Sequence, residues 1–206
     1  LDIGNISASD RVGSFFNNTK TGVKTADVAV QRLYSAIESG DLEDVKRFQI
    51  GIDINFQDKR GVTPLYHSIF HKQTELAPYL LRQGADVNLP DHEGLAPLHV
   101  AALENLPEMV ILLLDKGARL NATDKYGYTP LHLAIDQSSN SAADELLAAG
   151  AEVNNHLEWG HSPLHTSVAL GNLKMVKRIL GEGAEINSKD KLGRTPLHWA
   201  AEKGHL

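Results

Sequence analysis

The chain has 206 residues, of which 42% are apolar, and a formal net charge of −6. The acidic balance argues against nucleic acid as a partner, because binding phosphates requires concentrated Lys and Arg. The sequence contains no cysteine, which excludes disulfides and thiolate metal sites. No apolar run approaches the roughly 20 residues that span a bilayer, so we expect no membrane span and an intracellular protein, cytoplasmic with the nucleus as the alternative.

The first segment, residues 1–26, is rich in Ser, Thr, Asn and Gly and resembles nothing later in the chain. Phe15 and Phe16 are the apolar anchor in the middle of this polar arm. Its composition favours a flexible lead-in. The alternative is an arm that docks its two phenylalanines on the rest of the protein and shields part of it.

The remainder of the chain repeats with a fixed period of 33 residues. The clearest marker is a small residue followed by Pro and Leu: Thr63-Pro64-Leu65, Ala96-Pro97-Leu98, Thr129-Pro130-Leu131, Ser162-Pro163-Leu164 and Thr195-Pro196-Leu197. Glycines, Gly-Ala pairs and asparagines keep the same step. Such a period predicts stacked helical units that share one continuous core.

Each unit reads as two helices and a projecting turn. A Thr or Ser before Pro is a helix start, since the hydroxyl caps free N–H groups and Pro at the first position loses no bond. Pro107 fits the first turn of its second helix, whereas Pro78 lies deeper and should shift that helix start. Gly84 and its equivalents suit the left-handed residue that ends a helix. The Asp-x-x-Gly segments predict hairpin turns at Asp58, Asp91, Asp124 and Asp190.

The markers divide the chain into units. We expect a capping repeat at 27–57, four full repeats at 58–90, 91–123, 124–156 and 157–189, and a partial repeat at 190–206. The first unit lacks the Thr-Pro-Leu-His start, which fits a cap whose outer face meets water. The last unit stops at Leu206 after its first helix, so we expect the native protein to continue beyond this residue.

The segment Gly193 to His205, with the letters Gly-Arg-Thr-Pro-Leu-His-Trp-Ala-Ala-Glu-Lys-Gly-His, resembles the ankyrin repeat consensus almost letter for letter. The resemblance covers about Leu33 to Leu206. It implies an all-α repeat solenoid, in which each unit is a helix-turn-helix with a β-hairpin finger and the units form a curved stack.

Ten histidines raise the question of metal or catalytic sites. Four are the repeat's own Leu-His position, His99, His132, His165 and His198, and the resemblance implies that each imidazole bonds backbone and the Thr hydroxyl. The cluster from His156 to His161 matches no common zinc spacing and falls on a finger tip, which favours a solvated or partner-facing role. We therefore expect no metal site and no cofactor.

The same repeat spacing argues against catalysis. The glycines are dispersed at the repeat period and form no phosphate loop. Ser162 occupies a helix-capping slot, so its surroundings are not a nucleophile elbow. The carboxylate pairs Glu43-Asp44 and Asp144-Glu145 fall on second helices, whose charged residues usually face water. We expect no enzymatic activity in these residues.

The resemblance implies that a partner contacts the variable positions of the fingers and the first helices. The candidates for partner binding are Tyr126, Tyr128, Trp159, His161, Leu192 and Arg194 on the fingers and Phe70 and His71 on a first helix. Tyr, Trp and Arg dominate binding energy at interfaces; the alternative is that Tyr126 and Trp159 only brace one another. Trp199, directly after Leu-His, is interpreted as mainly structural.

The leading hypothesis is a scaffold that binds another protein or peptide through its fingers and the concave face of its first helices. The alternative is a regulatory or targeting arm of a larger enzyme, channel or secreted effector whose active domain lies outside this fragment. Nucleic-acid binding and a self-contained enzyme are the less favoured classes.

Overall fold

The computed structural model describes residues 25–205, with side chains from residue 28 onward. Of the N-terminal arm, only the last two residues are described, and they begin a helix at Thr25. Both interpretations of Phe15 and Phe16 lie outside the described residues and stay predictions.

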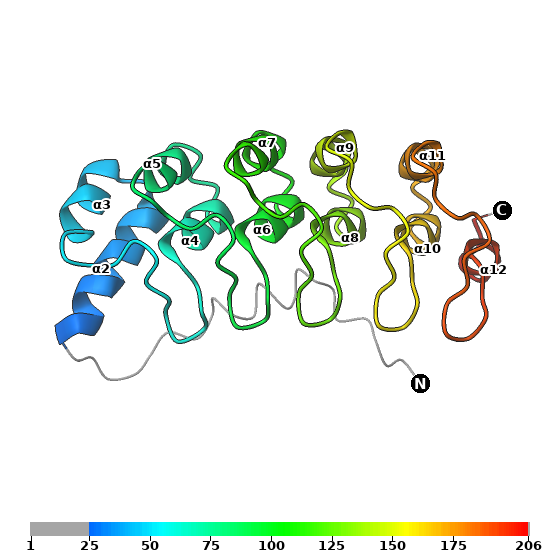
Figure 1. Ribbon diagram of the computed structural model, residues 1–206, viewed down its shortest axis with the longest axis horizontal. Helices are drawn as coiled ribbons and strands as arrows, with labels where there is room; N and C mark the ends of the chain where they lie inside the picture. The colour runs from blue at the N-terminus through cyan, green and yellow to red at the C-terminus, as the bar shows by residue number, and fades with distance from the viewer. Residues whose placement is uncertain (1–24, 206) are drawn as a thin grey trace.

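The described chain is helical throughout, and its helices form two parallel rows with the fingers on the opposite side from the second row (Figure 1). The first helices of successive units are α2 (Thr25–Ser39), α4 (Pro64–Phe70), α6 (Pro97–Leu103), α8 (Pro130–Asp136), α10 (Pro163–Ala169) and α12 (Pro196–Lys203). The second helices are α3 (Leu42–Phe48), α5 (Leu76–Arg82), α7 (Pro107–Asp115), α9 (Asn140–Ala148) and α11 (Leu173–Gly181). The expected all-α repeat solenoid is confirmed.

The first helices begin where the sequence predicts, because their start is a local structure. Thr129 Oγ1 accepts from the backbone N–H of His132, and the His132 Nδ1 in turn lies 2.8 Å from that oxygen. Proline occupies the first helical position, where no N–H is needed. Ala96 has no capping oxygen, yet its own N–H donates to His99 Nδ1 over 3.1 Å, so the histidine orders this turn as well.

The second helices show the predicted effect of proline depth. Helices α7, α9 and α11 begin at residues 107, 140 and 173, which are spaced by 33. Helix α5 begins at Leu76, two residues later than that spacing would place it. The shift leaves Pro78 within the first turn, where the missing N–H would have no partner inside the helix.

The fingers are hairpin turns, and residues 25–205 contain no β-strand. In the finger at 124–128, the N–H of Asp124 donates to the carbonyl of Tyr128, and one Asp124 carboxylate oxygen accepts from the N–H groups of Tyr126 and Tyr128. One cross-turn pair is too short for a ladder. The β-hairpin expected for each finger is therefore reduced to a side-chain-braced turn.

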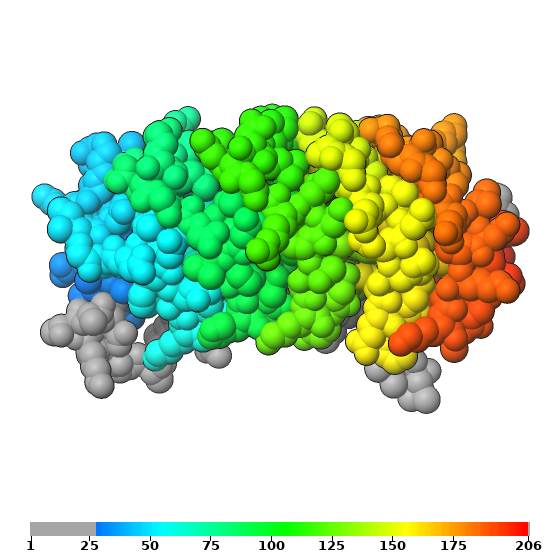
Figure 2. Space-filling view, viewed as in Figure 1, coloured from blue at the N-terminus to red at the C-terminus, as the bar shows by residue number. Residues whose placement is uncertain are grey.

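The core runs through the whole stack without interruption, and Figure 2 shows the units as adjoining bands of one surface. The small residues Ala101 and Ala102 are fully buried where α6 meets α8, because small side chains let first helices approach closely. Val110 and Leu113 are buried from α7. None of the described helices has the length and apolar character to cross a membrane.

Candidate partner-binding face

Neighbouring fingers are joined backbone to backbone. The N–H of Lys125 donates to the carbonyl of Glu93, and the N–H of Lys191 donates to that of Trp159. These bonds run from one finger to the next and hold the tips at a fixed spacing. Equivalent finger positions therefore form straight rows along the stack.

The tip row contains three of the candidate residues on three consecutive fingers. Tyr126 is 43% exposed, Trp159 65% and Leu192 77%. The Tyr126 hydroxyl donates to Glu93 Oε2 over 3.2 Å, and the Lys191 Nζ lies 5.9 Å from the centroid of the Trp159 ring. The structure thus brings these three large side chains to one edge of the molecule and leaves much of their surface in solvent.

The second row, two residues further along each finger, is half-buried. It contains the candidates Tyr128, His161 and Arg194. The Tyr128 ring lies 6.2 Å from that of His132, and the Arg194 Nε donates to Asp190 Oδ2 over 2.8 Å. These side chains pack against their own repeats, so the structure separates them in exposure from the tip row.

Trp199 ties this second row to the last unit. Its ring lies 4.4 Å from that of His161 and 5.1 Å from the Arg194 guanidinium carbon, and its Nε1 donates to Asp190 Oδ2. Burial would raise the pKa of the Asp190 carboxyl, but hydrogen bonds from Arg194 and Trp199 outweigh it and lower that pKa to about 2. Trp199 therefore packs between repeats, as the sequence predicts.

The last two candidates lie at the other end of the stack, where α4 ends. Phe70 packs partly against the core, and its ring meets that of His71 edge-on at 5.2 Å. His71 also lies 4.4 Å, ring to ring, from the buried His67. Burial, with smaller contributions from the positive charges of His71 and Arg60, lowers the pKa of His67 to about 3. Phe70 and His71 are thus well separated from the aromatic tip row.

A family model described as ankyrin repeats (3 copies) matches residues 33–124 and 131–206. The chain belongs to the ankyrin repeat family. A search of curated proteins finds no match to it. Ankyrin repeats are generally protein–protein interaction modules and are typically non-catalytic.

The ankyrin Leu-His histidines join consecutive units. His99 Nε2 lies 3.0 Å from the carbonyl oxygen of Tyr128, and His165 Nε2 lies 3.1 Å from that of Arg194. Burial lowers the pKa of His99 and of His132 to about 4, which keeps both rings neutral at pH 7. In the repeat that starts at Thr63, Tyr66 replaces this histidine and bonds Asp91. The predicted role of these histidines in the turns between ankyrin units is confirmed.

Sequence reasoning overlooked two residues beside His71, namely Glu38 and His67. Glu38 precedes His71 by 33 residues, and His67 precedes it by four. The first spacing places Glu38 at the equivalent point of the neighbouring ankyrin unit, and the second places His67 one helical turn away. Both signals were present in the sequence, but the capping unit lacks the marker motif that aligns it with the others.

Proposed function

We propose that the chain holds a partner protein or peptide across the face formed by its fingers and first helices. The observation that carries the proposal is the exposed row of Tyr126, Trp159 and Leu192 on three adjoining finger tips. The role we propose is intracellular and involves neither catalysis nor nucleic acid.

Packing within the repeats does not account for the size of these side chains. The corresponding tip residues in the two earlier units are Arg60 and Glu93, which serve the same turn with charged groups. Large exposed side chains grouped on one surface mark interaction sites. Tyr and Trp are also the residue types whose truncation at an interface costs the most, roughly 2 kcal/mol or more at a hot spot.

The half-buried second row would form the floor of this contact. Tyr128, His161 and Arg194 are held by His132, Trp199 and Asp190, so they lose little freedom on binding. Glu93 and Lys191 flank the aromatic tips with opposite charges. An apolar centre with a polar rim is the usual anatomy of a protein interface.

The test is capture of partners from cell lysate with the wild-type chain and with Tyr126→Ala/Trp159→Ala. A partner identified by mass spectrometry is then titrated against both proteins, and we expect its affinity to fall by at least about 30-fold in the double variant. Circular dichroism establishes that the double variant keeps its helices.

The matched control is Ile50→Ala/Ile111→Ala, which also truncates two exposed hydrophobic side chains but lies away from the fingers. We expect it to bind like the wild type. Equal capture by all three proteins would overturn the finger-tip site, and loss in the control as well would show that binding follows general surface hydrophobicity.

A further inference from the structure

The junction between the capping unit and the first full repeat gathers three ligand-type side chains from two helices. Glu38 lies at the end of α2, and His67 and His71 lie one turn apart at the end of α4. Two histidines at i and i+4 present their rings on one face of a helix, as in metal-binding helices. Packing of α2 against α4 brings the carboxylate of Glu38 to that face.

The distances among the three groups match those of a shared ion. Glu38 Oε1 lies 3.2 Å from His67 Nε2 and 3.9 Å from His71 Nε2. One ligand atom from each of the three residues lies within 4.8 Å of the other two. Two ligand atoms bound tetrahedrally to Zn²⁺ at about 2.1 Å lie about 3.4 Å apart. Small side-chain rotations are therefore sufficient to close the site.

We propose that Glu38, His67 and His71 bind one divalent transition metal ion of the Zn²⁺ type. Two imidazoles and one carboxylate are a donor set that binds zinc with a fourth position left open. The site would lie on the first-helix row and would join the capping unit to the repeat that follows it. The proposal stands independently of partner binding at the finger tips.

The surroundings support three rigid ligands. Gln73 Nε2 donates to the backbone carbonyl of Glu38 over 2.8 Å, which holds the end of α2 beside α4. The Tyr34 ring lies 4.7 Å from the His67 ring, and its hydroxyl donates to the carbonyl of Val62. These contacts fix the floor of the site from both helices.

The nearest positive charges are already paired with carboxylates. Arg60 lies 3.2 Å from Asp58, and Lys72 lies 3.0 Å from Glu104. Glu104 is the equivalent of His71 in the next unit, so the row reads Glu38, His71, Glu104 at steps of 33 residues. Its charge acts on His71 together with that of Glu38. The local field therefore contains the negative charge that a divalent cation requires.

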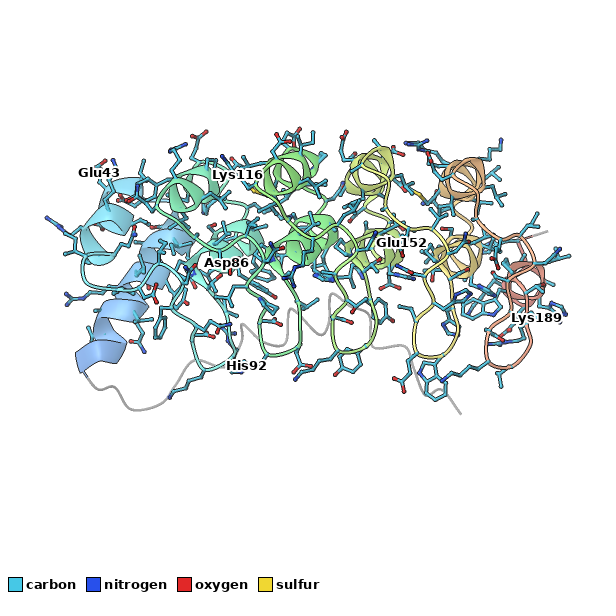
Figure 3. The ribbon with its side chains drawn as sticks, viewed as in Figure 1. Glu43, Asp86, His92, Lys116, Glu152 and Lys189 are labelled. Carbon is cyan, nitrogen blue, oxygen red and sulfur yellow. The ribbon has the colours of Figure 1, made fainter. Side chains whose placement is uncertain are left out.

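The test is calorimetric titration of ZnCl₂ into the 206-residue chain, prepared without a histidine tag and stripped with a chelator. We expect one Zn²⁺ per chain for the wild type. Glu38→Gln and His71→Gln should each weaken Zn²⁺ binding by at least about 10-fold, in line with the loss of one contact to a metal site. His92→Gln, which removes an exposed finger histidine (Figure 3), is the matched control and should bind like the wild type.

A second readout separates metal binding from folding. Ligands that bind only the folded state raise its melting temperature, so ZnCl₂ should raise that of the wild type and of His92→Gln but not that of His71→Gln. His71 is half-exposed, so its variant is expected to fold even if His67→Gln does not. Absence of Zn²⁺ binding by the wild type, or binding that survives both Glu38→Gln and His71→Gln, would overturn the proposal.

Discussion

The Oδ1 atom of Asn88 accepts a hydrogen bond from the backbone N–H of Arg119, 2.8 Å away and 31 residues further along the chain. The Nδ2 of the same side chain donates to the carbonyl of Gly117 over 3.0 Å. Asn154 makes the equivalent pair of bonds with Glu185 and Gly183. One asparagine per unit thus bonds the loop of the next unit, which explains why it keeps the repeat spacing.

Replacing Asn88 with Ala should destabilise the protein by about 1–3 kcal/mol, because two backbone groups of the next loop lose their partners. Urea unfolding followed by circular dichroism measures the change. Lys116→Ala, at an exposed position near the end of α7 (Figure 3), is the control and should stay within about 0.5 kcal/mol of the wild type. Equal stability of the two variants would show that the loop bonds are replaced by water without cost.

Two glycines with the same backbone conformation should differ in their tolerance of alanine. Gly117 has a φ of +86° and Gly160 a φ of +82°, so both substitutions carry the left-handed penalty of about 1–2 kcal/mol. A Cβ on Gly117 would meet nothing within 4 Å, whereas one on Gly160 would lie 2.8 Å from the backbone nitrogen of Lys191.

We therefore expect Gly160→Ala to lose about 1–3 kcal/mol more than Gly117→Ala, since backbone of the adjoining finger must move. The comparison uses the urea midpoints of the two variants. If Gly117→Ala were the more damaging change, the fingers would not be in the close backbone contact that the structure shows.

Stability should fall with acidification through the buried ankyrin histidines. Burial lowers the pKa of His99 and of His132 from 6.5 to about 4. The unfolded chain therefore takes up protons near pH 6.5 while the folded chain does not, and stability present above pH 6.5 is lost as pH falls towards 4. At pH 5 the loss is on the order of 1–2 kcal/mol for each histidine.

Urea unfolding of the wild type and of His132→Gln at pH 7 and pH 5 measures this effect. The variant should be less stable at pH 7, because it loses the bond to the carbonyl of Asn155, but it should show a smaller difference between the two pH values. His92→Gln removes an exposed imidazole and should keep the wild-type difference. An unchanged difference in His132→Gln would contradict a buried neutral ring at this position.

The sequence by itself determined the features that depend on neighbours within one turn. Thr129, Pro130 and His132 start a helix through contacts three residues apart, so the motif has the same outcome in every unit that carries it. The delayed start of α5 follows from Pro78 in the same local way. Because these patterns recur at a fixed step, they also determined the stacked architecture.

Only the tertiary structure decided which candidate residues are accessible. Tyr126 and Tyr128 are two residues apart on one finger, yet the first reaches solvent and the second packs beside His132. Likewise, Glu38 and His67 are 29 residues apart and become neighbours only when α2 packs on α4. Exposure and long-range proximity depend on how adjoining units are placed in space, and the local pattern of one unit does not encode that placement.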